Sequence, residues 1–187
     1  MKSHIFPAIK LTLCCVVLLS VLYPLSVFCV GLLTAPNYGK GETVQVAGRV
    51  AGYHLIGQPF SADKYFWSRP SAVGYNAAGS AGSNKGPSNP EYLATVQARL
   101  DSFLVHNPGV TAAQVPSELI TASGSGLDPD LSPAGAQVQA ARIARVRKID
   151  VATVNRLIAE HTEKPLLGLF GTSTVNVLSL NRALDAL

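Results

Sequence analysis

The chain has 187 residues, a formal net charge of +4 and 48% hydrophobic residues. The mild positive charge is not gathered into a basic block interleaved with aromatic residues, which argues against a nucleic-acid-binding protein. All three cysteines, Cys14, Cys15 and Cys29, fall in one apolar segment. Disulfides therefore cannot stabilise the remainder of the chain.

The first predicted element is a membrane-spanning helix over residues 11–33, which carry no charged side chain. A helix of this length spans roughly 35 Å, enough to cross a hydrocarbon core of ~30 Å. The apolar run is too long for a signal peptide, and the residues at its C-terminal end do not form an A-x-A cleavage site. The bulky Phe28 before Cys29 argues against a lipoprotein signal. We therefore expect an uncleaved anchor.

The charges that flank this segment predict its orientation. Lys2 and Lys10 precede it without an acidic residue, whereas Lys40 and Arg49 follow it together with an acidic residue. This modest bias favours a cytoplasmic N-terminus. The sequence thus predicts a cytoplasmic flank (residues 1–10), a transmembrane helix (residues 11–33) and one extracytoplasmic domain (residues 34–187).

Two residues of the span are candidates for packing on other membrane helices, Tyr23 and Pro24. Pro24 removes one backbone hydrogen bond and is expected to kink the helix. The polar side chains of the span, such as Tyr23 and Ser26, have two interpretations. They can pack against a partner helix, or their hydroxyls can bond to the backbone one turn back.

The N-terminal half of the domain is predicted to contain strands, a long loop and a helix. Residues 44–55 alternate apolar side chains with glycine breaks, which indicates short strands. Residues 68–90 are rich in Ser, Gly, Asn and Pro and indicate a loop. Asn89 and Pro90 then begin a helix. Its apolar face is expected to comprise Leu93, Val96, Leu100, Phe103 and Leu104.

The C-terminal half is predicted to be mainly helical. A short helix is expected near residues 115–120, a longer one over residues 132–148, and another after the cap Asp150. Ile149 and Val154 can form a hydrophobic staple around that cap. The core face of the capped helix is expected to comprise Val151, Val154, Leu157 and Ile158. A last strand is expected over residues 175–178. Since no βαβ rhythm appears, the fold class is α+β, a mixed domain of helices and short strands.

Few motifs in the chain point to catalysis. Walker A, GxGxxG, HExxH and CxxC patterns are missing, and the four histidines are scattered, so we predict no metal site. Ser61 and Lys64 form an SxxK tetrad, the pattern of penicillin-type acyl-transfer enzymes. That chemistry also needs S-D-N and K-T-G elements, which the chain lacks. An acyl-transfer enzyme is therefore a minor alternative.

The loops hold the predicted interface residues. Residues 65–72 place three aromatic side chains and Arg69 beside a proline, and such side chains often anchor protein interfaces. The alternative is that two of the aromatics at positions 65–67 belong to the core, because neighbours in extended chain point to opposite faces. Arg142, Arg145 and Lys148 fall three apart. They form either a solvated basic stripe or a docking surface for an acidic partner or lipid headgroups.

Several segments together resemble the C subunit of the Kdp potassium-transporting P-type ATPase, the KdpC family. The matching segments are YPL (residues 23–25), LIGQPF (55–60), YFWSRPSA (65–72), SAGSN (80–84), residues 121–133, residues 142–147 and VNVLSLNRALD (175–185). They cover nearly the whole chain in order. From these segments we take as interface candidates Tyr65, Trp67, Arg69, Ser83, Asn84, Asp128, Arg142, Asn176 and Asn181.

The resemblance implies an accessory subunit, not an enzyme by itself, in a four-protein complex of the bacterial inner membrane that imports potassium. The implied partners are a channel-like potassium-translocating subunit, a P-type ATP-hydrolysing subunit and a small membrane subunit. The subunit is expected to stabilise the assembly and to raise ATP affinity as a catalytic chaperone.

The residue that the resemblance links to nucleotide is Gln139. The predicted topology places Gln139 outside the membrane, away from cytoplasmic ATP. We therefore expect any effect on ATP affinity to be indirect, a coupling free energy between distant sites. The other alternative is a membrane-anchored extracytoplasmic sensor or assembly factor.

Overall fold

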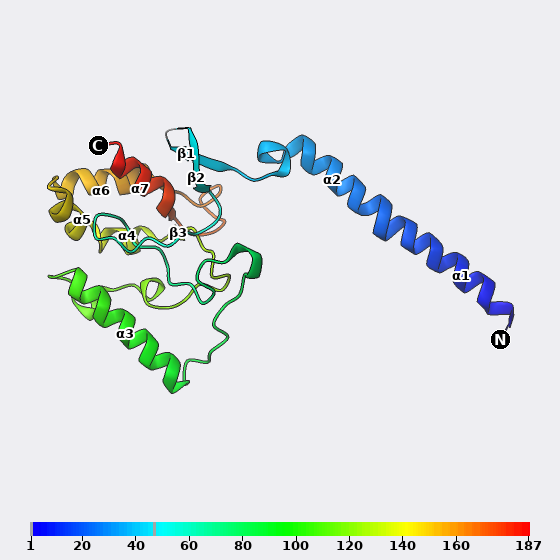
Figure 1. The fold of residues 1–187 in the computed structure, drawn as a ribbon, viewed down its shortest axis with the longest axis horizontal. Helices are drawn as coiled ribbons and strands as arrows, with labels where there is room; N and C mark the ends of the chain where they lie inside the picture. The colour runs from blue at the N-terminus through cyan, green and yellow to red at the C-terminus, as the bar shows by residue number, and fades with distance from the viewer. Residues whose placement is uncertain (1, 47) are drawn as a thin grey trace. The chain divides into compact units, whose positions relative to one another are not determined.

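A computed structural model describes residues 2–46 and 48–187 of the chain. The chain divides into two compact units, Met1–Glu42 and Thr43–Leu187. We describe each unit by itself (Figure 1).

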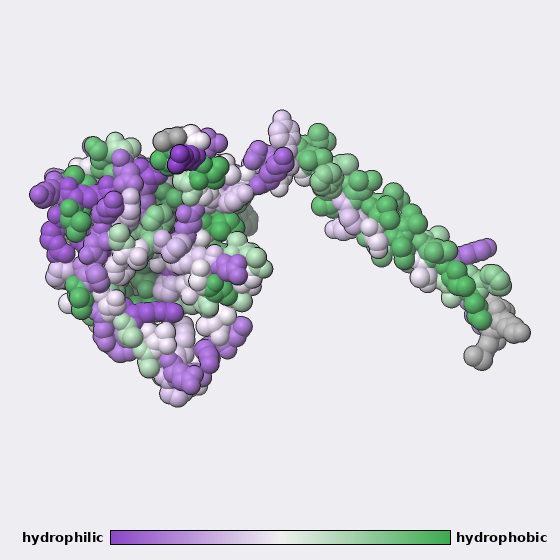
Figure 2. Space-filling model, in the orientation of Figure 1, coloured by the Kyte–Doolittle hydropathy of each residue, from purple (hydrophilic) through white to green (hydrophobic). Residues whose placement is uncertain are grey.

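The first unit is built around a long helix. It comprises α1 (Lys2–Val16), a π-helical stretch η1 (Val17–Leu22) and α2 (Tyr23–Thr34). In the part of the chain that the structure describes, His4–Thr34 is the one helix long and apolar enough to cross a membrane. Its surface is almost uniformly hydrophobic (Figure 2). The prediction of an apolar helix over residues 11–33 is confirmed, and the helix also continues through the predicted N-terminal flank.

The helix accommodates Pro24 through a change in hydrogen-bond register. The Tyr23 backbone N–H donates to the carbonyl of Leu18, five residues back rather than four. Such a wide turn gives room to a proline ring, which otherwise clashes with the carbonyl one turn before it. The Ser26 hydroxyl donates to the Tyr23 carbonyl at 2.8 Å, so for Ser26 the backbone-bonded alternative is confirmed.

The second unit contains two small antiparallel sheets. In the first, β1 (Thr43–Val46) pairs with β2 (Arg49–Tyr53), which confirms the strands predicted over residues 44–55. In the second, β5 (Thr174–Asn176) lies between β3 (Asp130–Leu131) and β4 (Thr162–Glu163). The α+β prediction is confirmed. A 3-10 turn, η3 (Ala77–Gly79), interrupts the long loop, and two more, η4 (Ala112–Gln114) and η5 (Ser117–Leu119), follow α3.

The described residues of this unit also form five helices, and side-chain caps explain where most of them begin. They are α3 (Pro90–His106), α4 (Pro133–Gln137), α5 (Ala140–Arg147), α6 (Val151–Glu160) and α7 (Val177–Asp185). Asn89, Ser132, Asp150 and Asn176 each accept a backbone N–H of the first turn of the helix that follows. Each cap satisfies a donor that the helix itself cannot pair.

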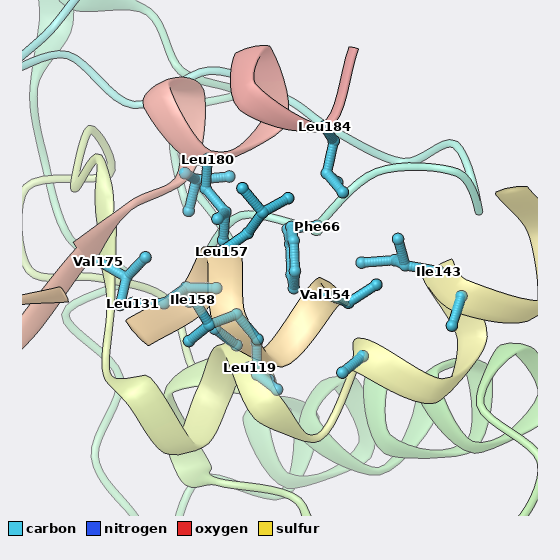
Figure 3. Close-up of a cluster of buried hydrophobic side chains, with 14 of the residues drawn as sticks. Phe66, Leu119, Leu131, Ile143, Val154, Leu157, Ile158, Val175, Leu180 and Leu184 are labelled. Atoms are coloured by element: carbon cyan, nitrogen blue, oxygen red, sulfur yellow. The ribbon is translucent and has the colours of Figure 1, made fainter. Parts of the chain in front are cut away.

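The core lies where α6 packs against α4, α5 and α7. Its largest members converge from these helices, from β3 and β5, and from the aromatic loop that carries Phe66 (Figure 3). The buried apolar residues drawn there include Phe66, Leu131, Ile143, Val154, Ile158, Val175, Leu180 and Leu184.

The structure corrects two predicted boundaries. The helix predicted over residues 132–148 is two helices, because the Gln139 N–H donates to Ala136 in a tighter three-residue turn. The strand predicted over residues 175–178 ends at Asn176, since that side chain caps α7 and turns the chain into a helix at Val177.

Two residues predicted for core faces are exposed. Leu93 is 52% exposed because α3 docks through its C-terminal half, where Phe103 is buried. Val151 is also exposed, because it lies in the first turn of α6, where the chain enters the helix from the surface.

Candidate functional site

The extended aromatic loop, residues 65–69, is held by a buried polar network, and Gln139 lies at its centre. Gln139 is 0% exposed. Its Oε1 accepts from the Trp67 backbone N–H at 2.8 Å and from the Arg142 guanidinium at 2.7 Å. Its Nε2 donates to the carbonyls of Gly135 and Trp67. Both ends of the amide are therefore occupied inside the domain.

Arg142 is the charged member of this network and is only 2% exposed. It donates to the Asn107 side chain at 3.0 Å and to the Asp63 carbonyl at 2.8 Å. Its guanidinium lies 4.7 Å from the centroid of the Trp67 ring, in a cation–π contact. Burial lowers the pKa of Arg142 to about 10, and the Asp63 carboxylate opposes this shift. The side chain therefore stays charged at neutral pH.

A second amide holds the neighbouring residue of the loop in the same way. Asn181 of α7 accepts from the Phe66 N–H at 2.8 Å and donates to the Phe66 carbonyl at 3.0 Å. Asn181 and Gln139 thus pair both backbone groups of Phe66 and Trp67, as the neighbouring strands of a sheet would. The loop is fixed by two side chains from two helices.

Asn176 joins β5 to the first hairpin and to β3. Its Oδ1 caps α7, while its Nδ2 donates to the His54 carbonyl at 2.8 Å and to Asp130 at 3.2 Å. Burial raises the pKa of Asp130; the bond from Asn176 opposes that shift, and neighbouring carboxylates add to it. Asn176 therefore has a structural role: it caps α7 and bonds to both His54 and Asp130.

These contacts correct part of the predicted interface. Arg142, Asn176 and Asn181 are buried and bonded within the domain, so they offer a partner almost no surface. Arg142 is also not part of the predicted basic stripe on the surface, because it lies next to Ile143 on the core face of α5. Gln139 likewise has no surface with which to contact a nucleotide in this conformation.

The predicted residues Arg69 and Asp128 meet in an ion pair. Their closest atoms are 2.6 Å apart, and both side chains are partly exposed. The pair joins the aromatic loop to the glycine-rich loop of residues 122–128. Gly57 packs against that loop so closely that an added Cβ would lie 2.5 Å from the Asp128 carbonyl oxygen. Such approach explains the glycines noted in the sequence.

Tyr65 lies in a cluster of charged side chains at the surface. Its hydroxyl donates to Asp185 at 2.8 Å, and Arg147 donates to the same carboxylate at 2.6 Å. Lys64 and Arg147 both lie over the Tyr65 ring, within cation–π distance. Although partial burial raises the pKa of Asp185, the hydrogen bonds from Arg147 and Tyr65 hold it below its usual value. We call these four residues the Tyr65 cluster.

Ser83 and Asn84 lie apart from these contacts. Asn84 is exposed and has a positive φ of 52°. Nearby, the Ser80 hydroxyl donates to the Ser125 carbonyl at 2.9 Å, which holds the two glycine-rich loops together. The loop that carries Ser83 and Asn84 is therefore anchored at its base and exposed beyond it.

A cleft of about 380 Å³ opens between α3 and the aromatic loop. Its walls combine apolar side chains with hydroxyl groups and one arginine, which also donates to the Ile120 carbonyl. The lining residues are Phe60, Ser61, Trp67, Ser68, Pro70, Thr95, Ala98, Arg99, Ser102, Phe103 and Leu119.

The SxxK tetrad, Ser61 to Lys64, lies in a turn of the chain. Residues 61–65 form a turn closed by a bond from the Tyr65 N–H to the Ala62 carbonyl, not a helix. The Lys64 ammonium lies 4.9 Å from the Tyr65 ring centroid. No cluster of His, Cys, Asp and Glu that could hold a metal ion occurs among residues 2–46 and 48–187.

The sequence did not single out several residues of the network and of the Tyr65 cluster, among them Asp63, His106, Asn107 and Asp185. Nδ1 of His106 lies 2.8 Å from the Asp63 carboxylate, and the centroid of the His106 ring lies 4.9 Å from that of Trp67. Asp185 pairs with Arg147. One signal was available for Arg142: Ala140, Ile143 and Ala144 mark a core face at helical spacing.

Comparison with known proteins relates the whole chain to one family. The protein-family model described as "KdpC: K+-transporting ATPase, c chain" matches residues 5–186. Proteins named "Potassium-transporting ATPase KdpC subunit" are 53% identical in Flavobacterium psychrophilum and 51% identical in Bacteroides fragilis. The first match covers 99% of each chain; the second covers 96% of this chain and 95% of the relative. A relative of the same name from Methylococcus capsulatus is 46% identical over the full length of both chains.

Proposed function

Since the chain belongs to the KdpC family of K+-transporting ATPase subunits, we propose that it is a non-catalytic accessory subunit that stabilises an ATP-driven potassium import complex. The proposed partners are a channel-like potassium-translocating subunit, a P-type ATP-hydrolysing subunit and a small membrane subunit. The observation that carries the proposal is a match that includes both the apolar helix and the domain, at about half identity over the full length.

The proposed topology is a single span with a cytoplasmic N-terminus and an extracytoplasmic domain. The apolar helix and the lysines before it support this orientation. Labelling tests it in a cysteine-free background, with Cys14, Cys15 and Cys29 replaced by serine. A membrane-impermeant maleimide should label Ser88→Cys in intact cells and Ser3→Cys only after permeabilisation. The reverse pattern overturns the topology.

The proposed effect on ATP is to raise the affinity of the ATP-hydrolysing subunit indirectly. The oxygen and the nitrogen of the Gln139 side-chain amide are both bonded inside the domain, and the side chain is fully buried. A nucleotide could reach it only after the network opened, which would take one acceptor from the buried Arg142 guanidinium at a cost of about 1.5–3 kcal/mol. Indirect coupling between sites avoids that cost.

The Tyr65 cluster and the Arg69–Asp128 pair are the proposed contacts with partner subunits. Both present tyrosine or arginine side chains at the surface, and these types dominate the energy of protein interfaces. Asn84 on the exposed glycine-rich loop is a third candidate. In the membrane, Tyr23 and Pro24 are proposed to pack on partner helices, since Tyr23 is exposed on the helix surface.

The experiment that tests the assembly is a tagged pull-down in mild detergent from cells starved of potassium. We expect the P-type subunit and the channel-like subunit to co-purify. The replacement of Tyr65 and Arg147 by alanine should weaken recovery, and Arg156→Ala, an exposed arginine on α6, should not. Recovery of the chain alone, together with unchanged potassium uptake after its deletion, would overturn the proposal and favour a separate sensor or assembly factor.

The ATP effect has its own test. The Michaelis constant for ATP of the purified complex should be lower with the subunit than without it, while the purified subunit alone should not bind ATP. Saturable ATP binding by the full-length subunit, abolished by a Gln139 substitution that leaves the fold intact, would contradict indirect coupling.

A further inference from the structure

The connection between β4 and β5 exposes four large apolar side chains at one hairpin tip. Leu166 is 70% exposed, Leu167 80%, Leu169 81% and Phe170 64%. Residues 165–173 carry no charged side chain. A run of four such residues is uncommon on the surface of a domain that has a buried core of its own. We call residues 165–170 the apolar tip.

The apolar tip is an ordered hairpin and not an extension of the core. Backbone bonds join Leu166 to Phe170 in both directions, at 3.1 and 3.0 Å. Three residues lie between this pair, and the first two, Leu167 and Gly168, have positive φ, as in the primed turns of tight hairpins. Asparagine or glycine normally occupies such positions, and leucine there is strained. The fold gains nothing from a strained, exposed leucine, so this side chain points to a contact outside the domain.

A further exposed apolar residue lies next to the hairpin formed by β1 and β2. Leu55, which follows β2, is 69% exposed. Its neighbour Gly57 donates to the Leu127 carbonyl, and Asp128 shares a hollow with residues 172–174 at the base of the apolar tip. The connection leads into β5, which pairs with β3, and Asn176 at the end of β5 donates to the carbonyl of His54, next to Leu55. The apolar tip therefore lies near the hairpin at which the chain enters the domain.

The chain itself brings a lipid surface within reach of the apolar tip. The apolar helix ends at Thr34 and β1 begins at Thr43, so residues 35–42 are the whole linker. Eight residues span at most about 28 Å. A domain of residues 43–187 has a radius of gyration of about 15 Å. Tethering at this length gives a high effective concentration, so even a weak lipid contact is populated.

We propose that the apolar tip inserts into the headgroup and acyl boundary of the bilayer that holds the anchor. Leu166, Leu167, Leu169 and Phe170 leave water, while the exposed Lys164 at the base of the hairpin faces the lipid phosphates. The inference rests on the proposed anchoring of the chain, but it does not depend on any partner subunit. It assigns this surface to lipid and leaves the Tyr65 cluster and the Arg69–Asp128 pair free for proteins.

Depth-dependent fluorescence quenching of the full-length chain in nanodiscs tests the proposal. The label is placed at Leu169→Cys in the background that lacks Cys14, Cys15 and Cys29. Nitroxides on the lipid acyl chains should quench it, with a depth of ~5–10 Å at the boundary. The matched control is a label at Lys85→Cys, an exposed loop position outside the apolar tip, which should respond only to an aqueous quencher.

Replacement of Leu166 and Phe170 by serine should move the label at position 169 into water and leave the circular dichroism spectrum unchanged, since both side chains are exposed. Equal, weak lipid quenching at positions 169 and 85 in the chain alone overturns the proposal. A second result would also overturn it: no lipid quenching at position 169 in the chain alone or in the purified complex, together with protection of that position from the aqueous quencher only in the complex. That result would assign the apolar tip to a partner protein. A failed pull-down, by contrast, leaves the quenching result unaffected.

Discussion

The replacement of Gln139 by leucine separates a structural role from a nucleotide-binding role. Leucine has a similar volume but no hydrogen-bonding group. The Trp67 N–H and one Arg142 nitrogen then lose the acceptor that lies 2.8 and 2.7 Å away. A buried N–H without a partner costs about 1–3 kcal/mol, and bonds to charged groups are at the upper end. We expect a loss of about 3–5 kcal/mol, a large part of the 5–15 kcal/mol typical of a domain.

Urea unfolding of the full-length chain in mild detergent measures this loss. Trp67 is the only tryptophan and lies at the network, so its fluorescence reports the unfolding of the relevant region. With an m-value of about 2 kcal/mol/M, the midpoint should fall by about 2 M. Gln139→Glu keeps the acceptor and should lose less. Gln97→Leu, an exposed glutamine on α3, is the matched control and should shift the midpoint by less than about 0.3 M.

Two outcomes would refute this reasoning. One is a Gln139→Leu midpoint equal to that of the Gln97 control, which would mean that the network does not stabilise the domain. The other is a Gln139→Leu protein of unchanged stability whose complex has lost the effect on ATP affinity. That result would assign Gln139 to the nucleotide after all and would require a conformation in which its side chain is exposed.

Three further substitutions test the close approach of the loops and the pH dependence of stability. Gly57→Ala should destabilise the domain by about 1–3 kcal/mol in the same urea assay, because the new Cβ would clash with the backbone of Asp128. In the control Gly86→Ala the new Cβ has no atom within 4 Å, so this substitution should be neutral or slightly stabilising. Because the pKa of Asp185 is lowered in the folded domain, this carboxylate stabilises the fold above its unfolded pKa of about 3.9, and that stability is lost as the pH falls through the folded pKa. Asp185→Asn should therefore make the urea midpoint fall less steeply between pH 7 and pH 3. The raised pKa of Asp130 has the opposite effect on stability, because the unfolded chain releases this proton at a lower pH than the folded domain does. Asp130→Asn should therefore raise the urea midpoint at pH 7. A lower midpoint would contradict the burial argument.

The features that the sequence predicted correctly are local ones. The apolar helix follows from a run of uncharged residues, and the caps Asn89 and Asp150 follow from their own neighbours in the chain. The alternation argument for the aromatic loop is confirmed only in part. It placed two of the three aromatic side chains in the core, whereas only Phe66 is fully buried; Trp67 packs against the core but stays partly exposed, as does Tyr65. Each inference needed only residues within one or two turns of each other.

The features that the sequence missed depend on residues far apart in the chain. Arg142 bonds to residues 35 and 79 positions away, and Asn181 bonds to one 115 positions away. No periodicity records such pairings. The spacing of Arg142, Arg145 and Lys148 indicated a stripe, but Lys148 is the left-handed cap where α5 ends, and Arg142 faces the core. The one available signal was the helical spacing of Ala140, Ile143 and Ala144, which marks the core face on which Arg142 lies.

The two amides that hold the aromatic loop limit how the domain can transmit a signal. Gln139 belongs to the junction of α4 and α5, and Asn181 belongs to α7, so movement of the loop would break bonds to both. The buried charge of Arg142 adds a further cost to any opening. A change large enough to matter inside this domain would therefore cost several kcal/mol, while reorientation of the whole domain on an eight-residue linker costs far less. If the subunit couples to ATP hydrolysis, rigid-body placement of the domain is the physically cheaper route. A label on Lys85→Cys would then change its distance to the bilayer during turnover, while its distance to a label on Leu169→Cys stays constant.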